Sequence, residues 1–115
     1  MKKTLPDNNE EVTCEIGLPE KMGMHLRPAA LVAKLAMHHG TKLTLIVDKK
    51  EFDAGNVLSI TIASGLIAKR GYKKACFRGD KKVINDLKFL AEFNYGEDEK
   101  GNQAPLPDEL AHLRE

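Results

Sequence analysis

The segment GMHLRPAA, at positions 23–30, combines residue types that could bind and transfer an anion. Gly23 permits backbone angles that other residues avoid, so it can fold a loop back over the start of a helix. Pro28 suits the first turn of that helix, where a missing amide donor is tolerated. His25 would then lie at or just before the helix start, where unpaired amides and the helix dipole favour an anion.

Arg27 adds a permanent cation that can hold two oxygens of one phosphate or carboxylate. A neutral imidazole at position 25 could attack a phosphoryl group and become a phosphohistidine, with the helix amides and Arg27 stabilising the new charge. This chemistry needs no metal in the domain. A lone histidine before a helix is also commonly a solvated cap, and the residues alone leave that alternative open.

Composition limits the class of protein. The chain has 115 residues, with 18 basic and 17 acidic side chains and a net charge of +1. A charge this small creates no overall positive potential that would attract nucleic acid or an anionic membrane. No apolar run approaches the roughly 20 residues of a membrane span, and the amino terminus is too polar for a signal peptide. We therefore expect a single cytoplasmic domain, without nucleic-acid binding or membrane insertion.

Hydrophobic periodicity predicts the order strand, helix, strand, strand, helix, strand, helix. Asn56 and Asp80 are expected to cap the second and third helices, and Gly40 to end the first. This order predicts an α+β fold, a two-layer sandwich with three helices on one face of a four-stranded antiparallel sheet. The expected strands are 12–18, TKLTLIVD at 41–48, about 51–53, and a fourth at YKKACFR before a turn at Gly79. The expected helices are one with Pro28 in its first turn that runs to about His39, one at 57–68 and a last one after Asp80.

The second helix carries more apolar surface than a small sheet can bury. Two apolar stripes compete on it, and we expect one to be buried while Val57 and Leu58 form an apolar rim near His25. The first stripe is Leu58, Ile62 and Leu66; the second is Val57, Ile60, Ala63 and Ile67.

The domain is expected to span 11–93, with 1–10 as a flexible lead and 94–115 as an acidic, mobile tail. Within that tail PDELAHLR could form a short helix, and the acidic run at 97–99 could fold back on a basic cluster. That cluster consists of Lys73, Lys74, Arg78, Lys81 and Lys82. The remaining histidines, His38, His39 and His112, are expected to be solvated, without a metal.

Residues 23–30 resemble the active-site signature of HPr, the histidine-containing phosphocarrier of the bacterial phosphoenolpyruvate-dependent sugar phosphotransferase system. The resemblance covers about 11–93 and includes the HPr-like order of elements. It implies that His25 accepts phosphate from enzyme I and passes it to enzyme IIA-type domains, while Arg27 steadies the phosphoryl group. It also implies a monomer without a cofactor, a carrier rather than a free-standing enzyme. The phosphate contacts would be Gly23, Leu26 and Arg27, and the partner contacts Met24, Leu26, Val57 and Leu58.

Two features depart from the usual pattern of that family. Leu26 replaces a small residue, which makes the surface beside the histidine bulkier. The serine that a regulatory kinase modifies in many members aligns with Asn56 or with Ser59; Asn56 is the better cap, so we doubt regulation by such a kinase. A second hypothesis is an HPr-like regulatory binding module, whose affinity for a kinase or transcription factor is tuned by phosphorylation.

Overall fold

The computed structural model describes residues 10–19 and 24–114. Within these ranges four antiparallel strands form one sheet in the order β1-β4-β2-β3, which is not their order along the chain. The central pairing aligns Phe77 with Cys14 on one side and with Leu45 on the other, and Leu45 aligns with Phe52. These side chains share the core face. The strands are β1 (Glu11–Gly17), β2 (Leu43–Val47), β3 (Lys50–Asp53) and β4 (Lys74–Asp80).

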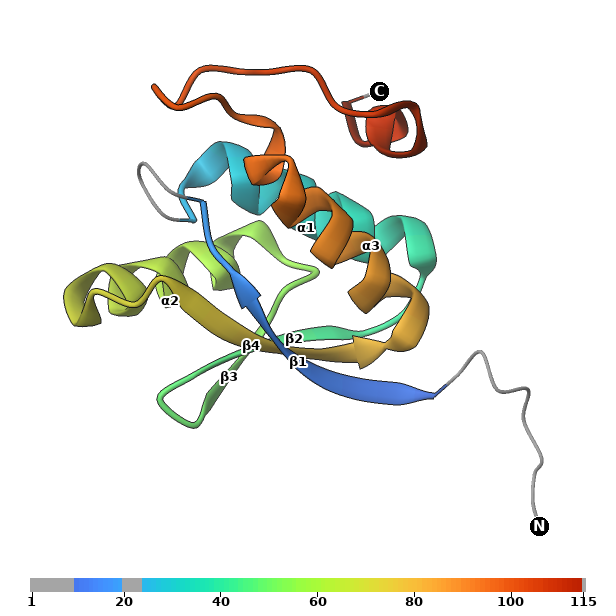
Figure 1. The fold of residues 1–115 in the computed structure, drawn as a ribbon. Helices are drawn as coiled ribbons and strands as arrows, with labels where there is room; N and C mark the ends of the chain where they lie inside the picture. Colours follow the sequence, from blue (N-terminus) through green and yellow to red (C-terminus); the bar gives the residue numbers. More distant parts are fainter. Residues whose placement is uncertain (1–9, 20–23, 115) are drawn as a thin grey trace, which may run out of the picture.

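The helices of the described chain cover one face of this sheet, as the sequence predicts (Figure 1). Leu35, Ile60 and Leu87, one from each helix, are fully buried between the two layers. The α+β sandwich prediction is therefore confirmed. The helices are α1 (Leu26–His39), α2 (Val57–Arg70) and α3 (Lys81–Glu92).

The predicted caps fix the ends of the helices. The Oδ1 atom of Asn56 accepts hydrogen bonds from the amides of Leu58 and Ser59, at 2.9 and 3.2 Å. Asp80 accepts a hydrogen bond from the amide of Lys82 at 3.4 Å and is the N-cap residue of α3. Left-handed glycines end α1 at Gly40 and α2 at Gly71, so α2 runs two residues beyond the predicted position 68.

The two apolar stripes of α2 separate as expected. Ile60, Ala63 and Ile67 are buried against the sheet. Leu58 and Ile62 on the other stripe remain 69% and 61% exposed. One stripe therefore packs in the core, and the other adds apolar surface to the outside of the molecule.

Gly79 does not form the turn that we predicted after the fourth strand. It lies inside β4, paired with Val12 of β1 and Leu43 of β2. A Cβ atom there would lie 3.1 Å from Leu43 Cδ1 and from the Lys42 carbonyl oxygen. This close packing explains the glycine, and the chain turns at Asp80, which is the last residue of β4 and the N-cap of α3.

The C-terminal segment differs most from expectation. Residues 94–114 contain two short 3-10 helices, η2 (Asn94–Gly96) and η3 (Asp108–Arg114), and both helices contact α1, so the segment does not leave the core as a tail (Figure 1). Tyr95, Leu110 and Leu113 are each about 1% exposed, and this apolar burial explains the packing. The expected short helix at PDELAHLR is confirmed as η3. The expected lead lies outside the described residues except for Glu10.

Tyr95 ties this segment to the first strand. Its hydroxyl donates a hydrogen bond to the carbonyl oxygen of Gly17, at 2.6 Å. Burial raises the pKa of Tyr95 far above its usual value, so the hydroxyl keeps the proton that it donates. The chain beyond α3 is thereby held beside the end of β1.

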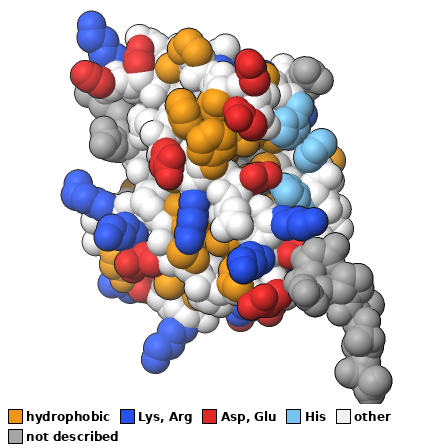
Figure 2. Space-filling view, turned by 45° about the vertical axis from the view of Figure 1, so that its right-hand side comes forward, with side chains coloured by type: hydrophobic (Ala, Val, Ile, Leu, Met, Phe, Trp, Pro, Cys, Tyr) orange, Lys and Arg blue, Asp and Glu red, His pale blue; other side chains and the backbone are white. Residues whose placement is uncertain are grey.

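Charges of both signs are interspersed over the face shown in Figure 2, together with a patch of hydrophobic side chains.

The predicted screening of the basic cluster by residues 97–99 is wrong for Arg78. Its guanidinium binds Glu51 of β3 through hydrogen bonds of 2.8 and 3.1 Å. Within the described ranges, no helix has both the length and the hydropathy that crossing a bilayer requires.

Candidate functional site

His25 is the N-cap residue of α1, as the sequence predicts. Its backbone is extended, and its carbonyl oxygen accepts the first intrahelical hydrogen bond, from the amide of Ala29 at 3.0 Å. Its side chain does not cap the helix. The helix itself offers no acceptor to the amides of Leu26 and Arg27 in the first turn, which gives this end of α1 the character of an anion site.

The imidazole of His25 instead contacts Glu97, a residue that our sequence reasoning assigned to a mobile tail. Nε2 of His25 lies 3.0 Å from Oε1 and 2.9 Å from Oε2 of Glu97. The carboxylate side chain is 1% exposed and the histidine side chain 26%. One edge of the ring thus meets a buried carboxylate, while part of the ring remains open to solvent.

Arg27 lies beside the same carboxylate, that of Glu97. Its Nη1 atom is 3.6 Å from Oε2 of Glu97 and donates a hydrogen bond to the carbonyl oxygen of Gly101, at 3.1 Å. Its side chain is 46% exposed. The structure therefore brings the predicted histidine and arginine together through a carboxylate from the C-terminal segment.

No local signal in the sequence could have identified Glu97. It is 72 residues from His25, and it begins an acidic run that is typical of a solvated tail. The apolar spacing of Tyr95, Leu110 and Leu113 was the available hint that this segment packs. Even that hint would not have indicated which carboxylate meets the histidine.

The expected phosphate and partner contacts fall into three groups. Leu26 and Leu58 are 68% and 69% exposed, as surface contacts must be, and Val57 is half-buried. Met24 is completely buried, so we correct its assignment as a partner contact: its side chain fills the core beneath the site. Gly23 lies outside the described residues.

The two candidates for the regulatory serine position occupy the start of α2. Asn56 is the N-cap residue, and Ser59 lies half-buried in the first turn. The amide of Ser59 is already bonded to the Asn56 side chain. Asn56 thus has the structural role that we expected, and its equivalence to a modified serine stays a prediction.

The other histidines are not simply solvated. Nε2 of His39 lies 2.8 Å from Oδ2 of Asp86, which joins α1 to α3. The rings of His38 and His112 have centroids 4.2 Å apart, which joins α1 to η3. Among the described residues, no group of three or more histidine, cysteine, aspartate or glutamate side chains is arranged to hold a metal ion.

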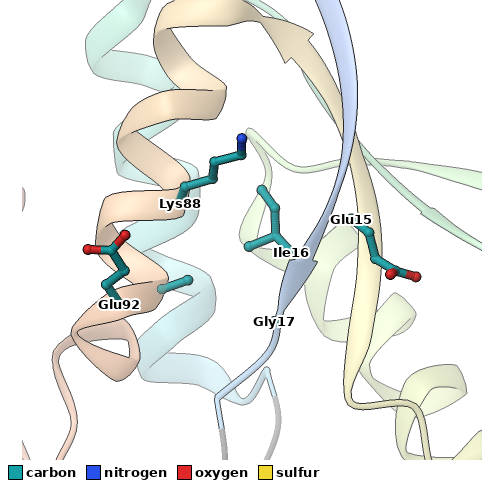
Figure 3. A pocket seen from close by; sticks show the side chains of 6 residues that line it. Glu15, Ile16, Gly17, Lys88 and Glu92 are labelled. Carbon is teal, nitrogen blue, oxygen red and sulfur yellow. The ribbon is translucent and has the colours of Figure 1, made fainter.

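A surface groove of about 370 Å³ lies elsewhere, between β1 and α3 (Figure 3). Lys88 and Glu92 of α3 flank it, and Ile16 and Gly17 of β1 form its other side. Neither His25, Arg27 nor Glu97 lines this groove, so it forms no part of the candidate site.

One comparison with solved structures bears on the fold. A crystal structure described as HPr-C-His from Thermoanaerobacter tengcongensis superposes with a TM-score of 0.57 at 27% identity. The match covers 77% of this chain and 98% of that one. No protein-family model matches the sequence, and no curated protein matches it. The chain therefore has an HPr-like fold, and part of its length lies outside the match.

Proposed function

We propose that this chain is a phosphoryl carrier of a phosphotransferase system. His25 accepts a phosphoryl group from phosphorylated enzyme I and yields it to enzyme IIA-type domains, as implied by the resemblance of GMHLRPAA to the HPr signature. The observation that carries the proposal is the position of His25 as the N-cap residue of α1 in an HPr-like fold, with its side chain not used as a cap.

The surroundings of His25 support this chemistry. A phosphoryl group on the ring would lie near the positive end of α1, where amides without intrahelical partners stabilise its charge. The half-exposed guanidinium of Arg27 can add a charge-assisted hydrogen bond. Neither interaction is covalent, so the group stays transferable. Cofactor and metal have no part in the proposed transfer.

Exposed apolar side chains on α1 and α2 support transient docking of protein partners. Leu26 follows the histidine directly, and Leu58 and Ile62 lie on the exposed stripe of α2. Small apolar contact areas with polar rims are typical of weak, rapidly exchanging complexes. We propose that the carrier acts as a cytoplasmic monomer and that these side chains contact both donor and acceptor domains.

The test of the proposed function is phosphorylation by enzyme I, phosphoenolpyruvate and magnesium, followed by intact mass spectrometry. We expect the mass of one phosphoryl group after an alkaline quench, its loss after an acid quench, and no addition to a His25→Ala variant. Phosphorylation that persists in that variant or survives acid would contradict the proposal. A stable partner complex formed by unphosphorylated protein without need of His25 would instead favour the regulatory binding module.

Arg27→Ala should slow phosphoryl transfer by about 10- to 1000-fold, by analogy with the loss of one electrostatic donor in other enzymes. The rate of phosphorylation by limiting enzyme I measures this effect. Arg70→Ala is the matched control, because Arg70 ends α2 and pairs with Asp48 in an ion pair that does not involve the site. Equal rates for the two variants would show that Arg27 does not stabilise the transferred group.

A further inference from the structure

The contact between His25 and Glu97 requires an explanation beyond packing. Removing a carboxylate from water is costly unless it is paired and hydrogen-bonded. Glu97 is 1% exposed: its Oε1 atom accepts from Nε2 of His25 at 3.0 Å, whereas its Oε2 atom, 2.9 Å from the same nitrogen, has no hydrogen bond of its own among the described residues. Nη1 of Arg27 lies 3.6 Å from Oε2. The imidazole N–H is therefore the hydrogen-bond donor that satisfies the buried carboxylate.

The backbone around Glu97 is built to hold it there. The Glu97 amide donates to the carbonyl oxygen of Asn94 at 3.1 Å, and Glu97 pairs with Gln103 in an isolated β-bridge. The preceding residue, Gly96, accepts hydrogen bonds at 2.8 Å from the amide of Ala104 and from the guanidinium of Arg114. The carboxylate thus projects from a braced loop rather than from a free chain end.

We propose that Glu97 is a positioning residue for His25, a role that rests on the phosphoryl-carrier function proposed above. The carboxylate can only accept, so it binds the ring through Nε2–H. In the neutral imidazole the proton then stays on Nε2 and the lone pair on Nδ1, which makes Nδ1 the nitrogen that attacks phosphorus. In hydrolase triads a carboxylate likewise fixes the tautomer and orientation of a catalytic imidazole, although there it binds Nδ1–H and leaves Nε2 to react.

The transfer balances without moving the proton on Nε2. The lone pair of Nδ1 forms the N–P bond, and the bond between phosphorus and the donor's leaving atom breaks with its electron pair remaining on the donor. The ring of His25 gains positive charge, which the Glu97 carboxylate compensates. When an acceptor nucleophile attacks phosphorus, the N–P electron pair returns to Nδ1 and the neutral ring is restored.

The tautomer can be measured without any partner protein. In ¹⁵N-histidine-labelled chain, at a pH high enough for the nitrogen shifts to show a neutral His25 ring, those shifts should place the proton on Nε2. Glu97→Gln should give a mixture, because an amide can either accept from Nε2 or donate to it. Glu99→Gln is the matched control, since it makes the same charge change at an exposed residue of the same segment.

Two results would overturn the inference. One is a wild-type His25 that carries its proton mainly on Nδ1, a result that needs no variant to fold. The other is a folded Glu97→Gln variant whose tautomer ratio equals that of the wild type. If enzyme I fails to phosphorylate the wild type, the proposed function fails, whereas the nitrogen shifts still decide whether Glu97 sets the tautomer.

Transfer kinetics supply the second readout. Glu97→Gln should accept phosphate from enzyme I about 10- to 100-fold more slowly than wild type, by analogy with partners that orient metal-bound histidines. Glu99→Gln should match the wild type. A faster Glu97→Gln variant would mean that the carboxylate blocks the site rather than prepares it, and would overturn the proposal.

Discussion

At the scale of single residues, the site depends on which neighbours surround a few atoms. One ring nitrogen of His25 contacts the buried carboxylate of Glu97. The neighbouring residue, Met24, is completely buried in the core. Adjacent positions in GMHLRPAA thus have opposite environments. A motif specifies which residue types are present, but the exposure of each side chain follows from the direction in which the backbone presents it.

Glycine substitutions test the packing at this scale. Gly79→Ala should lower the free energy of unfolding by about 1–3 kcal/mol, because the added methyl group would crowd Leu43 and the Lys42 carbonyl oxygen. Urea denaturation followed by circular dichroism measures the change.

Gly65→Ala is the matched control for that substitution. Gly65 lies in α2 with nothing within 4 Å of an added Cβ atom, so alanine there should raise the free energy of unfolding by about 0.5–1 kcal/mol. Opposite signs are expected for the two variants. A Gly79→Ala protein as stable as the wild type would show that the space between β4 and β2 accommodates a methyl group at position 79.

At the scale of elements, capping determines where the helices begin and therefore where His25 and the start of α2 lie. α1 begins after a histidine whose side chain leaves the helix amides uncapped, whereas α2 begins after an asparagine that caps two of them. Only the first arrangement leaves an anion site. The difference supports a chemical role for the start of α1 and a structural one for the start of α2.

Asn56→Ala should lower the free energy of unfolding by about 1 kcal/mol, because the amides of Leu58 and Ser59 lose their side-chain acceptor. Asn56→Ser should retain most of the wild-type stability, since a serine oxygen is also a good cap. Thermal and urea denaturation of the three proteins checks both expectations. Equal losses for alanine and serine would argue that the asparagine contributes something other than a cap.

At the scale of the whole molecule, the C-terminal segment belongs to the folded unit. It supplies Leu110 and Leu113 to the core and brings Glu97 to the histidine, so stability and site geometry are coupled through one segment. The site is therefore assembled from both ends of the described chain. We propose that the folded domain extends to about residue 114 rather than to 93.

Leu113→Ala should lower the free energy of unfolding by about 2–5 kcal/mol, the range for removing a buried leucine side chain. Leu58→Ala, at an exposed leucine, should change it by less than about 0.5 kcal/mol. Urea denaturation of both variants gives the comparison. If residues 94–114 were a mobile tail, Leu113→Ala would be as neutral as Leu58→Ala.

The sequence by itself determined the features that depend on neighbours along the chain. Hydrophobic periodicity located the strands and helices, Asn56 and Asp80 marked the caps, and Pro28 placed His25 at a helix start. These signals are readable because hydrogen bonds within a turn or a helix join residues a few positions apart.

The tertiary structure alone decided the rest. The burial of Met24, the place of Gly79 within a strand and the contact of Glu97 with His25 all depend on segments that are distant in sequence. No local pattern encodes which surfaces meet when helices pack on a sheet. The carboxylate beside the histidine exists because η2 and η3 bury their apolar side chains against α1, and that packing is a property of the whole fold.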